Sequence, residues 1–139
     1  MVWVAIPNRG ISKPLFRQSK SEAVDSHIYI NECLEKRLLS FIPEHHTDSY
    51  FYIIYIFVLY FWPDLAGCHY SKQTIALMDE NVNFVPKEIN PPNIPQARPI
   101  ENCWDCLAQK VYEGGWEDKT EQQLIRRIEK YLIQIFCRT

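Results

Sequence analysis

Thirteen consecutive apolar or aromatic residues, from Tyr50 to Trp62, constrain the fold of this chain more than any other feature. A membrane-spanning helix needs about 20 such residues, so the run is short for a membrane span. Its members are mostly β-branched or aromatic, and these residue types pack well in sheets. We therefore predict a buried strand that stops at Pro63 and Asp64, and no contact with a membrane. The alternative that stays open is a small membrane-associated protein anchored by this run.

The residues before this run alternate between strand and helix patterns. Val2–Ile6 is almost continuously apolar and is followed by the turn residues of Pro7–Gly10. Ile11–Arg17 can return beside it as the second strand of a hairpin. Apolar residues at helical spacing then predict a helix over Glu22–Phe41, which ends before Pro43 because the residue before a proline disfavours helix.

The second half of the chain contains three predicted helices. In chain order, we predict a helix over Tyr70–Asn81, a short strand over Asn81–Val85 and an extended proline-rich loop over Glu88–Pro99. Pro99 suits the first position of the next helix, which ends at Gly114-Gly115. Thr120 and Gln123 have the spacing of a capping box and open the last helix. The apolar faces of these two helices consist of Ile100, Trp104, Leu107, Ala108 and Val111, and of Leu124, Ile128, Leu132 and Ile135.

Helices that alternate with strands favour an α/β protein with helices layered over a sheet. A hairpin that leads into helix-linked strands predicts a mixed sheet, and 139 residues fit one domain over 1–139. The net charge of -2 gives no general attraction to DNA, so contact with nucleic acid would need a local basic patch or a segment outside this chain. The five cysteines are an odd number, which favours free thiols, and Cys103 and Cys106 are interpreted as incidental residues of a helix rather than half a zinc site.

Two carboxylates stand out by their placement. Asp64 lies where an apolar strand runs into a loop, a frequent location of catalytic groups in α/β proteins. Glu101 lies in the first turn of the helix that begins at Pro99, where a negative charge also suits the helix dipole. An ordinary turn or N-cap residue, and a surface acid at a helix start, are the alternatives. The two acids have 36 residues between them (65 to 100).

Three segments resemble characteristic stretches of the Tc/mariner superfamily of DNA transposases. Pro91–Trp104 (PPNIPQARPIENCW) is similar to PPxSPDLNPIENxW, Trp62–His69 (WPDLAGCH) to QDNAPxH, and Met1–Gly10 (MVWVAIPNRG) to VWGAISxxG. The block RPIENCW is the most specific part, and the resemblance covers nearly the whole chain. It implies the C-terminal part of a DDE catalytic domain, with an RNase H-like mixed sheet flanked by helices.

In that family, three acids hold two divalent cations, normally Mg²⁺ or else Mn²⁺, during DNA cleavage and strand transfer. Two cations can stabilise the attacking and the leaving oxygen together, and carboxylate oxygens suit such hard ions. The resemblance makes Asp64 the second acid and Glu101 the third, so both are predicted to be catalytic and metal-binding. His69 matches the family's histidine after the aspartate, with an ordinary helix-start histidine as the alternative. The implied partners are transposon ends and target DNA, with a homodimer as a candidate assembly, in the nucleus.

The chain departs from the family pattern at several points. The first acid has no counterpart, because the chain starts at Met1 inside the strand that follows this acid, and the family's helix-turn-helix modules are absent. Asp25 belongs to the first helix and Asp48 precedes the aromatic run, and neither matches a catalytic position. Leu65 replaces the asparagine after the second acid, and Gln96–Arg98 replaces DLN. With two of three ligands, we expect little or no strand cleavage.

Two hypotheses follow from the resemblance. In the first, the chain is part of a cut-and-paste transposase, and a longer product or a partner chain supplies the first aspartate. In the second, which we favour for this chain, it is a catalytically inactive transposon relic or a co-opted module that binds DNA or protein without cutting.

Overall fold

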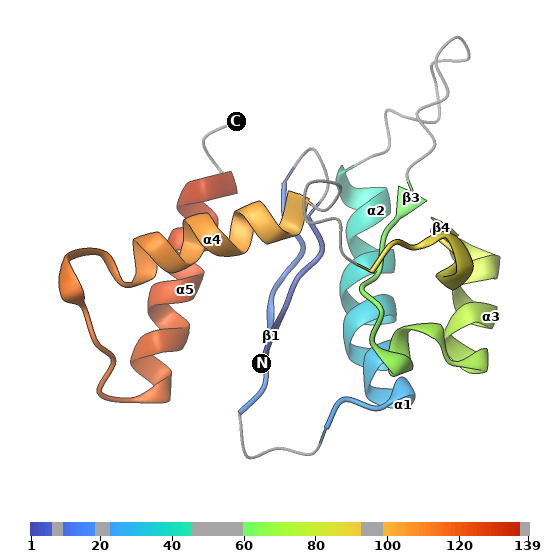
Figure 1. Ribbon diagram of the computed structural model, residues 1–139, viewed down its shortest axis with the longest axis horizontal. Coiled ribbons are helices and arrows are strands. Elements are labelled where there is room, and N and C mark those ends of the chain that lie inside the picture. The colour runs from blue at the N-terminus through green and yellow to red at the C-terminus, as the bar shows by residue number, and fades with distance from the viewer. Residues whose placement is uncertain (7–9, 19–22, 46–59, 93–98, 137–139) are drawn as a thin grey trace, which may run out of the picture. The chain divides into compact units, whose positions relative to one another are not determined.

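The computed structural model describes residues 1–6, 10–18, 23–45, 60–92 and 99–136. The chain forms two compact units. Met1–Ser21 together with Ile94–Thr139 make the first, called the terminal unit here, and Glu22–Asn93 make the second, called the central unit. Figure 1 shows the elements of both.

The terminal unit begins with an antiparallel hairpin, as predicted. β1 (Val2–Trp3) pairs with β2 (Leu15–Phe16). Beyond the paired residues, the amide of Ser12 donates to the Ala5 carbonyl at 3.0 Å, and the Ala5 amide donates to the Ser12 hydroxyl at 2.8 Å. Ser12 is fully buried, so this exchange satisfies a hydroxyl that would otherwise destabilise the core. The regular strands are shorter than predicted because a side chain takes over part of the pairing.

Two amphipathic helices complete the terminal unit (Figure 1). They are α4 (Pro99–Val111) and α5 (Glu121–Phe136), and they pack against each other. Their core consists of Leu107, Val111 and Leu132, each at most 4% exposed. The partly buried residues around this core are Ile11, Trp104, Trp116, Leu124, Ile128, Tyr131, Ile135 and Phe136. Most residues of the two predicted apolar faces therefore belong to this core. Ile100 is only partly buried and is not part of it, and Ala108 is exposed.

The helix ends follow the local sequence signals with one difference. Gly114 and Gly115 have φ angles of 74° and 73°, a left-handed conformation that glycine adopts easily, and they end the helical region after α4 as predicted. At the start of α5, the Thr120 hydroxyl accepts from the Gln123 amide at 3.3 Å. The Gln123 side chain, however, accepts from the amide of Lys119 rather than of Thr120, so only half of the predicted capping box forms.

A long helical stretch begins the central unit. It comprises α1 (Ser26–Ile28), η1 (Tyr29–Leu39), whose hydrogen bonds are of the wider π type, and α2 (Ser40–His45). Our predicted start at residue 22 was too early, because the Asp25 side chain accepts from the Ile28 amide at 2.8 Å and caps the first turn. The predicted end before Pro43 was also wrong. Pro43 lies inside α2, and a proline in the last turn of a helix removes only one backbone hydrogen bond, so the helix continues past it.

The remainder of the central unit is a strand–helix–strand unit. β3 (Tyr60–Phe61) pairs in parallel with β4 (Asn83–Phe84), and between them lie η3 (Gly67–Tyr70) and α3 (Lys72–Asn81). A short turn, η4 (Lys87–Ile89), follows β4. The buried side chains of this unit come mainly from the long helical stretch and α3: they are Tyr29, Cys33, Leu34, Leu38, Phe41, Thr74 and Met78.

The two kinds of strand pairing that we expected both occur, antiparallel in the terminal unit and parallel in the central unit. Each pair lies within its own unit, so a single RNase H-like mixed sheet and a single domain stay predictions. Of the predicted buried strand over Tyr50–Trp62, residues 60 and 61 form β3, and residues 50–59 lie outside the described part of the chain. Burial was predicted wrongly for the end of this run, because Tyr60 is 65% exposed on its two-residue strand.

Candidate functional site

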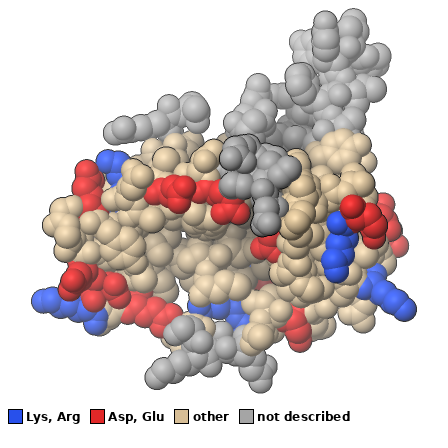
Figure 2. All heavy atoms as spheres, viewed as in Figure 1, with Lys and Arg blue, Asp and Glu red and all other residues tan. Residues whose placement is uncertain are grey.

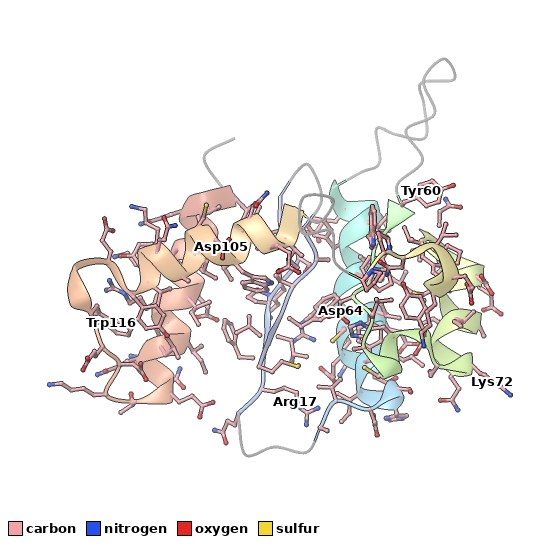
Figure 3. The ribbon with its side chains drawn as sticks, viewed as in Figure 1. Arg17, Tyr60, Asp64, Lys72, Asp105 and Trp116 are labelled. Atoms are coloured by element: carbon pink, nitrogen blue, oxygen red, sulfur yellow. The ribbon has the colours of Figure 1, made fainter. Side chains whose placement is uncertain are left out.

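Asp64 lies in the loop after the first strand of the parallel pair, behind Trp62 and Pro63 (Figure 3). Its side chain is 63% exposed, and its Oδ1 accepts a hydrogen bond of 2.8 Å from the Ala66 amide. An aspartate that binds the backbone two residues ahead stabilises a tight turn, so the turn holds the carboxylate in one orientation. The predicted position of Asp64, where a strand runs into a loop, is confirmed.

His69 lies against Asp64 within the central unit. Its Nδ1 lies 2.7 Å from Asp64 Oδ1 and 3.3 Å from the Asp64 carbonyl oxygen, and the residue is only 8% exposed. Because Nδ1 faces two oxygens, the geometry assigns the proton of a neutral imidazole to Nδ1. His69 therefore donates to the carboxylate rather than only starting a helix.

Tyr29 packs against this pair from the long helical stretch. Its ring centroid lies 4.0 Å from that of His69, with the planes tilted by 30°, and the residue is 1% exposed. Burial raises the pKa of the Tyr29 phenol well above its ordinary range, and the negative charges of Cys33 and Asp64 raise it further. The phenol is neutral at physiological pH, so Tyr29 places a polar but uncharged side chain beside His69.

Cys68 lies in the same turn as His69. Burial raises the pKa of its thiol, and the negative charges of Asp64 and Asp25 add to the shift. A thiol with a raised pKa is a weak metal ligand at neutral pH, because the thiolate is the form that binds. The candidate metal ligands of this loop are therefore the Asp64 carboxylate and the His69 imidazole.

Asn90 is a second polar centre, which the sequence did not reveal. It is 4% exposed, and its Nδ2 donates to the Pro63 carbonyl at 2.8 Å and to the Tyr70 hydroxyl at 2.6 Å. Its Oδ1 accepts from the indole N–H of Trp62 at 2.8 Å, and the Tyr70 hydroxyl donates to the Val85 carbonyl at 3.0 Å. This network fixes the chain immediately before Asp64. An asparagine in a proline-rich loop carries no sequence signal for such a role.

Glu101 lies in the first turn of α4, where it is partly exposed, as predicted from Pro99. Cys103 and Cys106 follow on the same helix, and both are free thiols. Burial of Cys103 and the charge of Cys106 raise the pKa of the Cys103 thiol. Both cysteines lie within a helix, as predicted.

Asp64 belongs to the central unit and Glu101 to the terminal unit. Their convergence on one cation therefore stays a prediction. Among the described residues, no group of three or more His, Cys, Asp or Glu side chains is arranged to hold a metal ion. Asp25 caps a helix, as its lack of a catalytic match suggested, and Asp48 lies outside the described residues.

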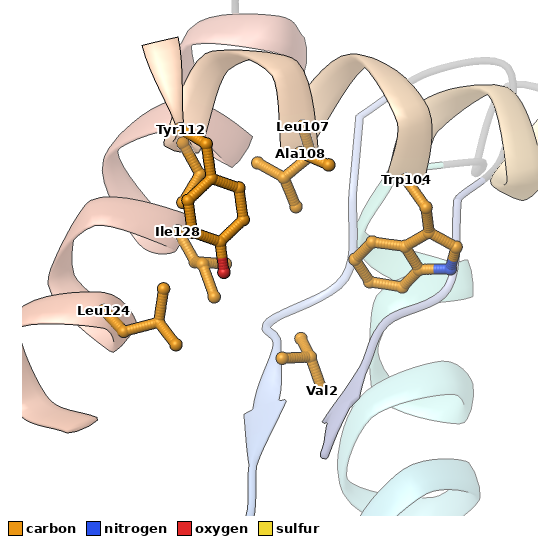
Figure 4. A pocket seen from close by; sticks show the side chains of 8 residues that line it. Val2, Trp104, Leu107, Ala108, Tyr112, Leu124 and Ile128 are labelled. Atoms are coloured by element: carbon orange, nitrogen blue, oxygen red, sulfur yellow. The ribbon is translucent and has the colours of Figure 1, made fainter. Parts of the chain in front are cut away.

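The terminal unit contains an apolar hollow of about 270 Å³ (Figure 4). It is lined by Val2 from β1 and by residues of α4 and α5 and the turn after α4, namely Trp104, Leu107, Ala108, Val111, Tyr112, Leu124 and Ile128. Its lining contains no acid or base, so it offers shape and apolar contact but no catalytic group.

Acidic and basic side chains are interspersed on the face seen in Figure 2. Within the part of the chain that the structure describes, no helix is long and apolar enough to cross a membrane. Comparison with known proteins gives no match to a family model, a curated protein or a solved structure.

Proposed function

We propose that the chain is the C-terminal part of the DDE catalytic domain of a Tc/mariner-type DNA transposase, with an RNase H-like fold. The observation that carries the proposal is the place of Asp64: an exposed carboxylate held in a turn three residues after the end of β3, a strand of a parallel pair. The resemblance of RPIENCW at the start of α4 to the family signature supports it and supplies Glu101. The proposed setting is the nucleus, with transposon ends and target DNA as substrates.

Asp64 and Glu101 would hold Mg²⁺ or Mn²⁺, since the accessible donors are hard carboxylate oxygens. When bound, the cations supply charge stabilisation for the attacking and the leaving oxygen of the phosphodiester. The chain's own residues orient these donors. Ala66 and His69 both donate to one oxygen of Asp64, and His69 is held in turn against the buried ring of Tyr29.

A second candidate is a transposon-derived module that binds DNA or protein without cutting. Two observations favour it. Asp64 Oδ1 already accepts from two donors, so a cation must compete with His69 for that oxygen. Asp25, the nearest substitute for the first acid, is occupied as a helix cap.

Binding of Mn²⁺ to the full chain, measured by electron paramagnetic resonance of the free ion, tests the proposal. We expect Asp64→Asn and Glu101→Gln each to weaken binding at least about tenfold, because each removes a charged ligand. Asp105→Asn is the matched control, since Asp105 is an exposed acid one turn after Glu101 on α4. Equal Mn²⁺ affinity in all four proteins would exclude the proposed metal site.

Cleavage distinguishes the two candidates. Any Mg²⁺-dependent nicking of oligonucleotides by the full chain should disappear in both Asp64→Asn and Glu101→Gln. Nicking that survives both substitutions would place the active site elsewhere. Metal binding without nicking by the unchanged chain would favour the module that does not cut.

A further inference from the structure

Trp62 exposes an aromatic ring next to the proposed catalytic acid. The residue is 39% exposed, which is high for a tryptophan, a residue type that is highly buried on average. Residues two apart are separated by at most about 7 Å in an extended chain, so the backbone of Trp62 lies close to that of Asp64. The ring therefore borders the loop at which a substrate strand would be cut.

The position of the ring is fixed from inside the protein. Its indole N–H donates to Asn90 Oδ1 at 2.8 Å. The side-chain NH2 group of Asn90 in turn donates to the Pro63 carbonyl and the Tyr70 hydroxyl. Because the polar edge of the indole is satisfied, the part that faces solvent is apolar. A ring that is already ordered loses little conformational entropy when a flat ligand stacks on it.

The neighbouring turn η4 carries side chains of mixed character. The backbone N–H of Asn90 donates to the Lys87 carbonyl at 3.3 Å. This bond joins the turn to Asn90, the residue that holds the Trp62 ring. Lys87, Glu88 and Ile89 are all exposed, and Ile89 is 71% exposed. One cation beside one anion gives little net attraction for a phosphate backbone. Stacking is therefore the interaction that this surface offers. It favours unpaired bases, because the faces of bases within a duplex are already covered by neighbouring base pairs.

We propose that Trp62 is a stacking platform for an unpaired base of a DNA strand at the Asp64 loop. This inference rests on the proposed function, because DNA cleavage at Asp64 is what brings a strand to this surface. Every base has a π-face, so such a platform binds without regard to sequence.

Fluorescence anisotropy with labelled oligothymidine and with an abasic strand of the same length tests the platform. The full chain is used with EDTA present, so that metal binding does not contribute. The two strands share a backbone and differ only in the bases. We expect the unchanged chain to bind oligothymidine roughly 5- to 100-fold more tightly than the abasic strand. Trp62→Ala should lose this preference, and Trp62→Phe should keep most of it because a stacking face remains.

Tyr112→Ala serves as the matched control, since Tyr112 is a 52% exposed aromatic residue of the terminal unit, and it should leave the preference unchanged. A preference that persists in Trp62→Ala would overturn the inference, and so would an unchanged chain that binds neither strand or both equally. Loss of the preference in Trp62→Ala, together with Mn²⁺ binding that does not depend on Asp64 or Glu101, would support the platform and refute the metal site.

Discussion

The surroundings of the Asp64 carboxylate determine what this residue can do. Ala66 and His69 donate to the same oxygen, and Tyr29 supports His69 from a buried position. A carboxylate that is accessible yet held by donors differs from an ordinary surface aspartate, which samples many orientations. The arrangement suits a metal ligand. It equally suits a contact between Asp64 and His69 at the start of a helix, without a metal. Substitutions of the residues around Asp64 therefore test the structure of this loop.

Tyr29→Phe should make the free energy of unfolding change less with pH in the alkaline range. The folded protein raises the pKa of the Tyr29 phenol above the value of about 10 in an unfolded chain, through burial and the charges of Cys33 and Asp64. The resulting stabilisation is fully present below about pH 10 and is lost as the pH rises towards the folded-state pKa. Urea unfolding at a series of pH values between about 9 and 11 measures the slope. Tyr112→Phe is the exposed control, and an unchanged slope in Tyr29→Phe would contradict the expected linkage.

Asn90→Leu should destabilise the central unit. The substitution leaves the Pro63 carbonyl and the Tyr70 hydroxyl without the Asn90 donor, and the Trp62 indole without its acceptor. A buried polar group that loses its partner costs about 1–3 kcal/mol, so we expect a loss of at least about 2 kcal/mol in the free energy of unfolding. Urea denaturation measures it. A change below about 0.5 kcal/mol, typical of a surface substitution, would show that the network does not hold the loop.

The residue scale also shows the limits of prediction from sequence. Asp64 and Glu101 were placed correctly relative to their strand and helix, because a strand end and a helix start have local signals. Tyr29 was not singled out from the sequence, because its contact with His69 depends on a partner 40 residues away (69 − 29). Contacts of this kind are set by tertiary packing, which local patterns do not encode.

Among the elements, those with both a periodic apolar face and a terminal signal were predicted best. α4 has Pro99 at its start and two glycines after its end, and α5 has Thr120 before its first residue. The strands over Val2–Ile6, Ile11–Arg17 and Asn81–Val85 were predicted too long, because regular pairing covers only two residues of each. The continuation of the helix past Pro43 was missed, because a proline near the end of a helix removes only one backbone hydrogen bond and need not stop the helix.

Adjacent residues of α5 provide a direct test of its packing face. Leu132 is 2% exposed and Ile133 is 58% exposed. Leu132→Ala should lower the free energy of unfolding by about 2–5 kcal/mol, because it removes apolar contacts and leaves a cavity. Ile133→Ala should change it by no more than about 0.5 kcal/mol. Equal losses in the two variants, measured by chemical denaturation, would mean that α5 packs by a different face.

At the scale of the whole molecule, the order of strands and helices was predictable, but their assembly was not. Local patterns predict a hairpin and a parallel strand–helix–strand unit, and both are present. Joining strands into one sheet depends on contacts between distant segments, and the RNase H-like sheet was expected from the family resemblance alone. Asp64 and Glu101 likewise belong to different units, so their shared role follows from that resemblance rather than from either local structure.

The central claim is that the carboxylates of Asp64 and Glu101 bind one divalent cation. Paramagnetic broadening of backbone amide signals by Mn²⁺, in NMR spectra of the full chain with Mg²⁺ as the diamagnetic reference, tests it most directly. At low ratios of Mn²⁺ to protein, we predict that the amides around Asp64 and those around Glu101 broaden together, and that Asp64→Asn reduces the broadening at both places. Broadening at only one of the two segments, or a loss at Asp64 that leaves Glu101 unaffected, would contradict the claim.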